Sequence, residues 1–135
     1  MDFIKEKINE NKKEQLANVV EKVWGREEWI VNNPKYCGKK MIIYKSYHCS
    51  MHCHKIKEES FYILSGKILI ETDFNGIKNK RIMIAGDVIH IKQNEYHRFT
   101  GLEHSEVIEF STHHMDEDSY RTELSGKIDL SKLEI

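Results

Sequence analysis

The sequence predicts an all-β protein, an antiparallel sandwich or barrel built from many short strands. From residue 23 onward, short runs of β-branched and aromatic residues follow one another. Turn signals such as 32–34, 65–66 and 73–76, rich in Asn, Pro, Ser and Gly, separate these runs. No strong helical periodicity lies between them, so strands alone account for most of the chain.

The elements follow one another without an internal repeat. Residues 1–22 are polar with scattered apolar positions, and we interpret them as an N-terminal extension with a weak helical signal over roughly 13–22. Residues 23–135 form the predicted barrel domain, which ends in a polar tail after residue 111. The strands expected in it are 29–31, 41–44, 61–64, 68–70, 81–84, 88–91, 98–100 and 107–110.

Composition limits the classes of function. A chain of 135 residues and 16.0 kDa is expected to form one domain. Its 21 Lys and Arg against 22 Asp and Glu give a net charge of −1, without the basic excess of a typical nucleic-acid binder. The hydrophobic share of 39% suffices for one modest core. Eight histidines against one proline is the unusual count, and it points to the chemistry of the chain.

The same sequence predicts a cytoplasmic location. No apolar run approaches 18 residues, so no membrane span is expected. The first seven residues carry charges of both signs and lack the apolar region of a signal peptide. Three cysteines, Cys37, Cys49 and Cys53, fit a reducing compartment better than a disulfide framework.

Three histidines and one glutamate are the candidate metal ligands. His52 and His54 lie two residues apart in an extended segment, so their side chains are expected on the same face. Glu59 follows five residues later, and His97 begins another strand after the turn at 93–95. This ligand set accepts a divalent ion of manganese, iron, cobalt, nickel or zinc and leaves coordination positions open for a substrate.

The spacing of these ligands resembles the cupin family. Residues 52–54 read His-x-His, and four residues then precede Glu59 and six more precede Gly66, as in the first cupin motif. In the second motif, Gly86 opens a strand and His97 follows eleven residues later. The resemblance covers about residues 38–112. It implies a jelly-roll β-barrel, a single double-stranded β-helix domain, with a metal ion held inside its mouth.

The chain departs from the cupin pattern at four turn positions. Lys92 replaces a frequent Pro, Gly101 replaces Asn, and Asn94 and Ser46 stand where the family has Gly. Asn tolerates the positive φ that Gly supplies, so we expect the turn at Asn94 to keep its shape. All four candidate ligands remain in place.

Other roles for the histidines stay open. His48, Cys49 and residues 52–54 form a dense cluster that could hold a structural zinc. No second ligand pair is evident, and alternation turns Cys53 away from His52 and His54, so Cys49 and Cys53 are better explained as small buried hydrophobes.

A looser resemblance indicates a reaction. The Trp24-Gly25 segment and the tail at 111–121 are similar to phosphomannose-isomerase-like cupins. That resemblance implies a mannose-6-phosphate-isomerase-like aldose–ketose isomerase, acting on a sugar or sugar phosphate through a metal-stabilised enediolate. Glu59 is then either the fourth metal ligand or the catalytic base, and Lys45 is a second catalytic candidate, with a solvated surface lysine as its alternative.

Six further residues are candidates for binding the substrate. Aromatic side chains can line a sugar pocket, whereas arginine and lysine suit phosphate or hydroxyl groups. Trp24 can instead serve as a hydrophobic plug, and His90 can simply be packed. The six candidates are Trp24, Lys40, His90, Arg98, Tyr120 and Arg121.

Two other classes of function remain. Three histidines also suit a metal-dependent dioxygenase or lyase acting on a small molecule, since open metal positions can bind oxygen or a carboxylate. The third class is a non-catalytic sugar-binding cupin. In each case the expected partner is a small molecule, with no nucleic acid and no membrane, and the family resemblance favours a homodimer.

Overall fold

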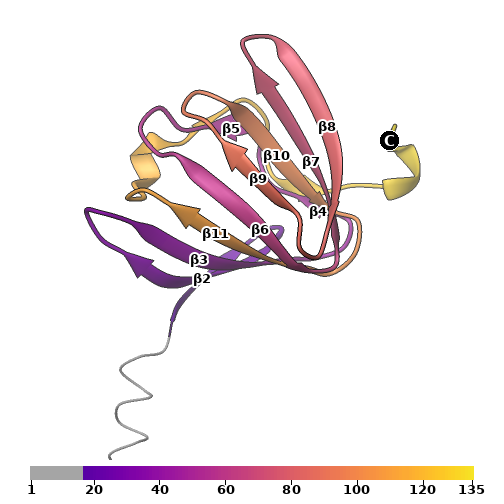
Figure 1. The fold of residues 1–135 in the computed structure, drawn as a ribbon. Coiled ribbons are helices and arrows are strands. Elements are labelled where there is room, and N and C mark those ends of the chain that lie inside the picture. Colours follow the sequence, from indigo (N-terminus) through magenta and orange to yellow (C-terminus); the bar gives the residue numbers. More distant parts are fainter. Residues whose placement is uncertain (1–16) are drawn as a thin grey trace, which may run out of the picture.

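Two antiparallel sheets face each other in the computed structural model, which describes residues 17–135 (Figure 1). The first sheet has six strands in the order β1-β2-β3-β11-β6-β9. Their bounds are β1 Asn18–Lys22, β2 Gly25–Asn32, β3 Cys37–Ile43, β11 Ser105–Ser111, β6 Glu59–Ser65 and β9 Val88–Ile91.

The second sheet is built around β10, which pairs with β7 along its whole length and with the short strands β5 and β4 on its other side. Strands β12 and β13 of the tail extend this sheet beyond β5 and β4. The bounds are β4 Tyr47–His48, β5 His52–Cys53, β7 Lys67–Phe74, β8 Ile77–Ile84, β10 Tyr96–Gly101, β12 Tyr120–Arg121 and β13 Gly126–Lys127. Two single-turn 3₁₀ helices, η1 Asp116–Asp118 and η2 Leu130–Lys132, complete the tail.

The prediction of an all-β barrel is confirmed, and all eight predicted runs fall within or overlap strands. The helix expected over roughly 13–22 is wrong where the structure describes it, because residues 18–22 form β1, and residues 1–16 lie outside the described part. The reason is pairing: β1 runs antiparallel to β2, from Asn18 opposite Trp29 to Lys22 opposite Gly25. Val19 and Val20 are β-branched and favour this extended state over a helix.

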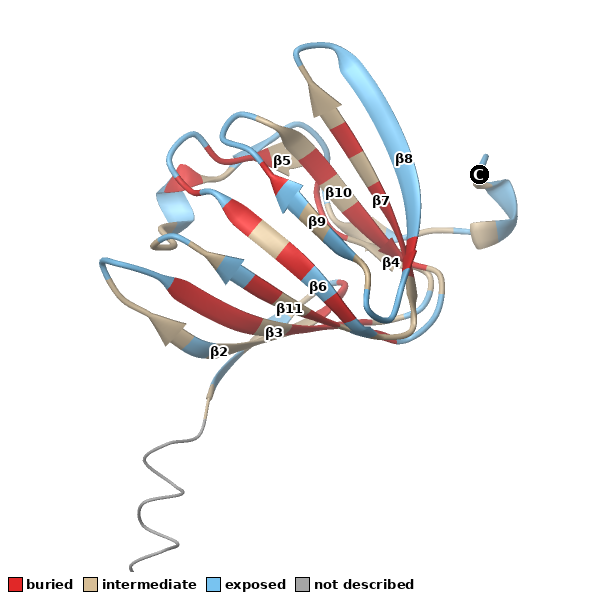
Figure 2. Cartoon of the chain, in the orientation of Figure 1, coloured by how far each residue is buried: buried red, intermediate tan, exposed pale blue. Residues whose placement is uncertain are grey.

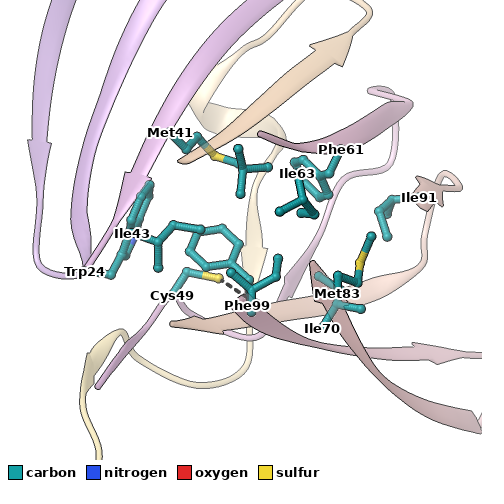
Figure 3. Close-up of a cluster of buried hydrophobic side chains, with 12 residues drawn as sticks. Trp24, Met41, Ile43, Cys49, Phe61, Ile63, Ile70, Met83, Ile91 and Phe99 are labelled. Atoms are coloured by element: carbon teal, nitrogen blue, oxygen red, sulfur yellow. Dashed lines mark hydrogen bonds between the residues drawn. The ribbon is translucent and has the colours of Figure 1, made fainter. Parts of the chain in front are cut away.

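The hydrophobic core lies between the two sheets and follows the strand alternation (Figures 2 and 3). Along β6, for example, Phe61 and Ile63 are buried, whereas the residues between and after them are more exposed. Figure 3 shows side chains from both sheets meeting in this core, with Trp24 at one end. Trp24 packs edge-to-face on Phe99 at a centroid distance of 4.8 Å, and the Phe99 backbone N–H donates to Cys49 Sγ at 3.3 Å.

At two positions where the chain departs from the cupin turn pattern, the backbone still has the conformation that a glycine would adopt there. Asn94 and Ser46 both adopt positive φ, 65° and 71°, the left-handed conformation that a glycine would adopt more easily. Gly66, in the turn from β6 to β7, has φ 86°, and a Cβ there would lie 2.3 Å from Ser105 Oγ. The turn chemistry expected at Asn94 is therefore confirmed.

The strands bring the predicted ligands to one end of the barrel. His52 in β5 pairs directly with His97 at the start of β10, and Glu59 begins β6 on the facing sheet. The end of the barrel where β5, β6 and β10 meet therefore carries the candidate site. Within residues 17–135, no helix is both long enough and apolar enough to cross a membrane.

Candidate metal centre

Three histidines converge at the mouth of the barrel. His52 lies in β5, His54 directly follows that strand, and His97 lies in β10. One ligand nitrogen from each falls within 4.8 Å of the others, and the ring centroids of His52 and His97 are 4.3 Å apart. His54 and His97 are buried and His52 is half-buried, so the cluster faces the interior. The same-face expectation for His52 and His54 is confirmed.

The second nitrogen of each ring is held by a backbone carbonyl. A carbonyl oxygen only accepts hydrogen bonds, so Nδ1 carries the proton and Nε2 keeps its lone pair for a metal ion. The distances from Nδ1 to the carbonyl oxygen are 2.8 Å for His52 and Ser50, 2.8 Å for His54 and Asp118, and 3.0 Å for His97 and Glu95.

Burial keeps two of these imidazoles neutral, which a metal ligand requires. Desolvation lowers the pKa of His52 to about 3 and that of His54 to about 4. Burial also acts to lower the pKa of His97, but the adjacent Glu59 carboxylate outweighs it and raises that pKa above its ordinary value.

Glu59 lies beside the histidine cluster. Its Oε1 lies 2.7 Å from His97 Nε2, and its Oε2 lies 3.7 Å from His54 Nε2. Although burial disfavours its charge, the facing His97, Lys57 and His54 hold the pKa of Glu59 well below its usual range. Despite these short contacts, both carboxylate oxygens and His97 Nε2 are fully buried and lack a well-aligned hydrogen bond. Buried polar atoms left unpaired in this way are costly unless a further group satisfies them.

A divalent transition metal ion fits these residues. Three imidazole nitrogens form a donor set that such ions accept, and the carboxylate of Glu59 lies beside them. The lone pairs left unpaired there are those that an ion would satisfy. Three histidine ligands, with or without Glu59, leave positions open for a small molecule. The zinc alternative with cysteine ligands is not supported: in residues 17–135, the group of three or more metal-ligating side chains contains only histidines. All three cysteines are free and buried.

The sequence interpretation missed a buried charged network beside the ligands. Lys57 Nζ lies 2.9 Å from Glu59 Oε2 and 3.3 Å from Glu109 Oε2, and these two carboxylates outweigh desolvation and raise the pKa of Lys57. Next to it, Lys39 Nζ lies 3.8 Å from Glu27 Oε1 and 4.1 Å from the centroid of the Trp29 ring. Lys39 and Glu109 stand directly opposite each other on β3 and β11.

One signal in the sequence could have revealed part of this network. Lys39 precedes Met41 by two residues, and Glu109 follows Val107 by two, so both occupy inward positions of alternating strands. A charged residue at such a position is buried only when it is paired. Lys57 lies in a loop and offers no comparable pattern.

A cavity of about 290 Å³ opens onto the metal ligands and this network. Of the predicted substrate residues, Trp24 and Arg121 line it, from opposite ends of the chain. Lys45 does not, because it is exposed in the turn between β3 and β4 and faces a separate hollow with Ser46 and Lys127.

The other four predicted substrate residues are also absent from the cavity wall. Each contacts a neighbour elsewhere on the barrel instead. The pairs are Lys40 with Glu106 at 2.6 Å, His90 with Ser60 at 2.6 Å, Arg98 with Glu71 at 3.1 Å, and Tyr120 with Lys55, whose Nζ lies 4.3 Å from the ring centroid.

The jelly-roll barrel has the cupin fold, with a histidine cluster at its mouth that can hold a metal ion, and solved structures agree with the fold. The chain superposes on oxalate decarboxylase of Bacillus subtilis with a TM-score of 0.71 at 14% identity, over 78% of this chain and 30% of that one. The oxalate decarboxylase of Lactobacillus farciminis, in a formate complex, gives a TM-score of 0.70 at 15% identity. That match covers 78% of this chain and 33% of the decarboxylase. This chain therefore spans about a third of the decarboxylase length.

A smaller protein matches over most of its own length. KdgF from Halomonas sp. gives a TM-score of 0.65 at 18% identity, covering 74% of this chain and 89% of that one. The B. subtilis oxalate decarboxylase has Mn(II) centres. No protein-family model matches the sequence, and no curated protein matches it either.

Proposed function

We propose that the chain is a metal-dependent aldose–ketose isomerase acting on a sugar or sugar phosphate. The observation that carries this proposal is the placement of Glu109, a buried carboxylate that is not a ligand but lines the same cavity as the three histidines. Moving a proton between adjacent carbons needs two groups, one that stabilises negative charge on oxygen and one that carries the proton. The histidine cluster suits the first role and Glu109 the second.

Each role has a physical basis. A bound divalent ion supplies Lewis acidity that polarises a carbonyl and stabilises the developing oxyanion. Burial and the neighbouring Glu59 raise the pKa of Glu109, against the opposing effect of Lys57. A carboxyl group whose pKa moves toward neutrality exchanges protons more effectively at cellular pH. Glu59 then serves as the fourth ligand, and Lys57 holds both carboxylates in place.

The charges in the cavity wall favour an oxyanion. Three largely buried carboxylates, Glu27, Glu59 and Glu109, face two buried lysines, Lys39 and Lys57, for a formal sum of 2 − 3 = −1. A divalent ion changes this sum to +1 while the histidines stay neutral. A buried site with a positive sum stabilises negative charge that develops on a substrate oxygen.

Two further residues suit the substrate class. Trp24, which also packs on Phe99 in the core, lines the cavity, so an aromatic side chain borders the space that a sugar ring would occupy. Arg121 is exposed at the mouth and stands opposite His52 in the β12–β5 pairing, and a guanidinium fork matches phosphate. We assign Trp24 to the sugar and Arg121 to a phosphate or an outer hydroxyl.

The test is proton exchange in deuterated water. Protein loaded separately with manganese, iron, cobalt, nickel or zinc is incubated with a panel of aldoses and aldose phosphates, and NMR follows ketose formation and deuterium at C2. We expect both, with Glu109→Gln retaining the metal but losing at least about 100-fold in rate, the usual contribution of a general base.

Other outcomes would assign the site elsewhere. Oxygen consumption, or cleavage of a carboxylate without exchange at C2, would identify the dioxygenase or lyase class. A sugar that raises the melting temperature without any turnover would identify a binding module. Either outcome contradicts the isomerase.

The assembly proposed for this function is a homodimer. Its support is the number of large apolar side chains exposed on the six-stranded sheet, among them Tyr62, Leu64, Val88 and Phe110. Sedimentation equilibrium of the full chain tests it, and a monomer at micromolar concentration contradicts it.

A further inference from the structure

The polar tail of the chain returns to the metal centre. After β11, η1 lies against the loop that joins β5 to β6, and its last residue, Asp118, is 2% exposed (Figure 1). The tail then pairs with β5, placing Tyr120 opposite Cys53 and Arg121 opposite His52. The side of β5 opposite β10 is therefore covered by residues more than 60 positions later in the chain.

The side chain of Asp118 binds this loop through three backbone donors. Its Oδ1 accepts from Lys55 N at 3.0 Å and Ile56 N at 3.1 Å, and its Oδ2 accepts from Lys57 N at 2.9 Å. Hydrogen bonds to an ionised carboxylate are stronger than neutral ones, and successive N–H groups of this kind form a concave anion site. The carboxylate thereby sets the backbone from which Lys57 reaches Glu59.

The backbone of the same residue binds a metal ligand. Asp118 O accepts from His54 Nδ1 at 2.8 Å, which fixes the ring and directs Nε2 toward His52 and His97. Ser50 and Glu95, the corresponding acceptors for His52 and His97, lie only two residues from their histidines, whereas Asp118 lies 64 residues away. Of the three ligands, His54 is thus the one whose orientation depends on the docked tail.

We propose that Asp118 is a positioning residue of the metal centre, which orients His54 through its carbonyl and the Lys57 loop through its carboxylate. This inference rests on the proposed metal site but goes beyond the proposed reaction, because it makes metal affinity depend on docking of the tail. By linkage, a bound metal must favour the docked tail to the same extent.

The first test is the metal affinity of Asp118→Asn. The amide turns an N–H₂ group toward backbone donors, so the loop and the Asp118 carbonyl shift. We expect an affinity about tenfold or more below that of the wild-type chain, the usual effect of losing such an outer partner, measured by competition with a chromophoric chelator. The matched control is Asp129→Asn, which removes an aspartate that also accepts a backbone N–H, from Ser131, but lies away from the metal cavity.

Two comparisons keep the outcomes apart. If His52→Ala does not weaken binding, the metal site itself is wrong. If His52→Ala abolishes binding while Asp118→Asn matches the wild type, the site stands and the role of Asp118 is overturned.

A second measurement uses the unaltered chain, in case Asp118→Asn does not fold. Adding the metal should slow hydrogen exchange at the amides of residues 55–57 and of Thr122, which donates to Met51 O at 2.9 Å. The amides of the β7–β8 hairpin serve as the internal reference. No slowing, or equal slowing in both places, overturns the proposal.

Discussion

Strands β3, β6 and β11 each contribute side chains to both ends of the barrel interior, the mouth and the deeper apolar end. On each strand the two inward positions are two residues apart. On each strand, the inward residue at the mouth is charged, and the inward residue two positions deeper is apolar. These pairs are Lys39 and Met41 on β3, Glu59 and Phe61 on β6, and Glu109 and Val107 on β11. Both members of each pair are at most 4% exposed, so burial alone does not distinguish the two ends.

This difference between charged and apolar inward residues indicates which end stabilises the fold. Apolar burial contributes favourably in proportion to its area, whereas a buried charge pair roughly breaks even against its desolvation. The deeper end, with Ile43, Ile63 and Met83 at 0% exposure, therefore stabilises the barrel. The mouth is tolerated because its charges are paired, and it carries the candidate metal centre.

Removing a ligand from the mouth should give the largest effect. We expect His97→Ala and His52→Ala to lose stoichiometric metal binding while the barrel stays folded, because each removes one of three converging nitrogens. Elemental analysis of the purified variants measures metal content, and circular dichroism checks the fold. Retained metal in the double variant would falsify the assignment of the site.

Breaking the charge pairing at the mouth should come next. Lys57→Met leaves Glu59 and Glu109 buried without their shared cation, so we expect a loss of about 3–5 kcal/mol in the free energy of unfolding of the metal-free protein. Urea denaturation measures it. The control is Lys67→Met. Lys67 Nζ lies 3.7 Å from Glu103 Oε1 in a solvent-exposed pair, which should contribute at most about 1 kcal/mol to the free energy of unfolding. Equal losses in the two variants would contradict a special role for the buried pair.

Cutting into the apolar end should separate stability from binding. Ile63→Ala removes a fully buried side chain, and we expect it to cost about 2–4 kcal/mol of unfolding free energy without changing metal affinity. Its neighbour Leu64 is 45% exposed and serves as the control, because Leu64→Ala should cost far less. A loss of metal in Ile63→Ala would show that the two ends are not independent.

Acid should act on the mouth and not on the apolar end. The pKa of His52 is about 3 and that of His54 about 4 in the folded chain, against 6.5 for an ordinary histidine. Below pH 6.5 the unfolded chain binds protons that the folded chain does not, so stability decreases as the pH falls. The expected slope for the metal-free protein reaches about 1.4 kcal/mol per pH unit for each histidine between pH 6 and 5. The raised pKa of His97 acts with the opposite sign: its contribution to stability is lost as the pH rises above 6.5, outside this window.

Denaturation at a series of pH values measures this slope, and His52→Gln should reduce it by the share of one histidine, up to about 1.4 kcal/mol per pH unit. An unchanged slope in His52→Gln would show that His52 is not buried in its neutral form.

The parts of the site that the sequence predicted are those fixed by local geometry. His52 and His54 share a face because strand alternation places them so, and Gly66 and Asn94 mark turns that need positive φ. His97 followed from the family spacing. Each of these inferences requires only a short stretch of chain or a known motif.

The parts that it missed depend on contacts between distant segments. Lys57 contacts Glu109, which is 52 residues away in the sequence, and Asp118 accepts a hydrogen bond from His54, which is 64 residues away. Nothing local distinguishes Lys57 from the other lysines of the chain, or Asp118 from the neighbouring Asp116, which is solvent-exposed. Such partners become identifiable only once the strand order is known.

Substituting Lys45 by Met should have the smallest effect of the changes considered, and Lys57 is its natural comparison. The family resemblance made Lys45 a catalytic candidate, but Ser46 at φ 71° turns the chain there and leaves Lys45 exposed outside the cavity. We therefore expect Lys45→Met to change metal content, unfolding free energy and isomerisation rate by no more than experimental error, within about 0.5 kcal/mol for stability. The same substitution at Lys57 should alter stability strongly. If Lys45→Met instead lowers turnover while metal content stays intact, the turn must close over the cavity during the reaction, and the mouth of the barrel would include a segment that this structure places outside it.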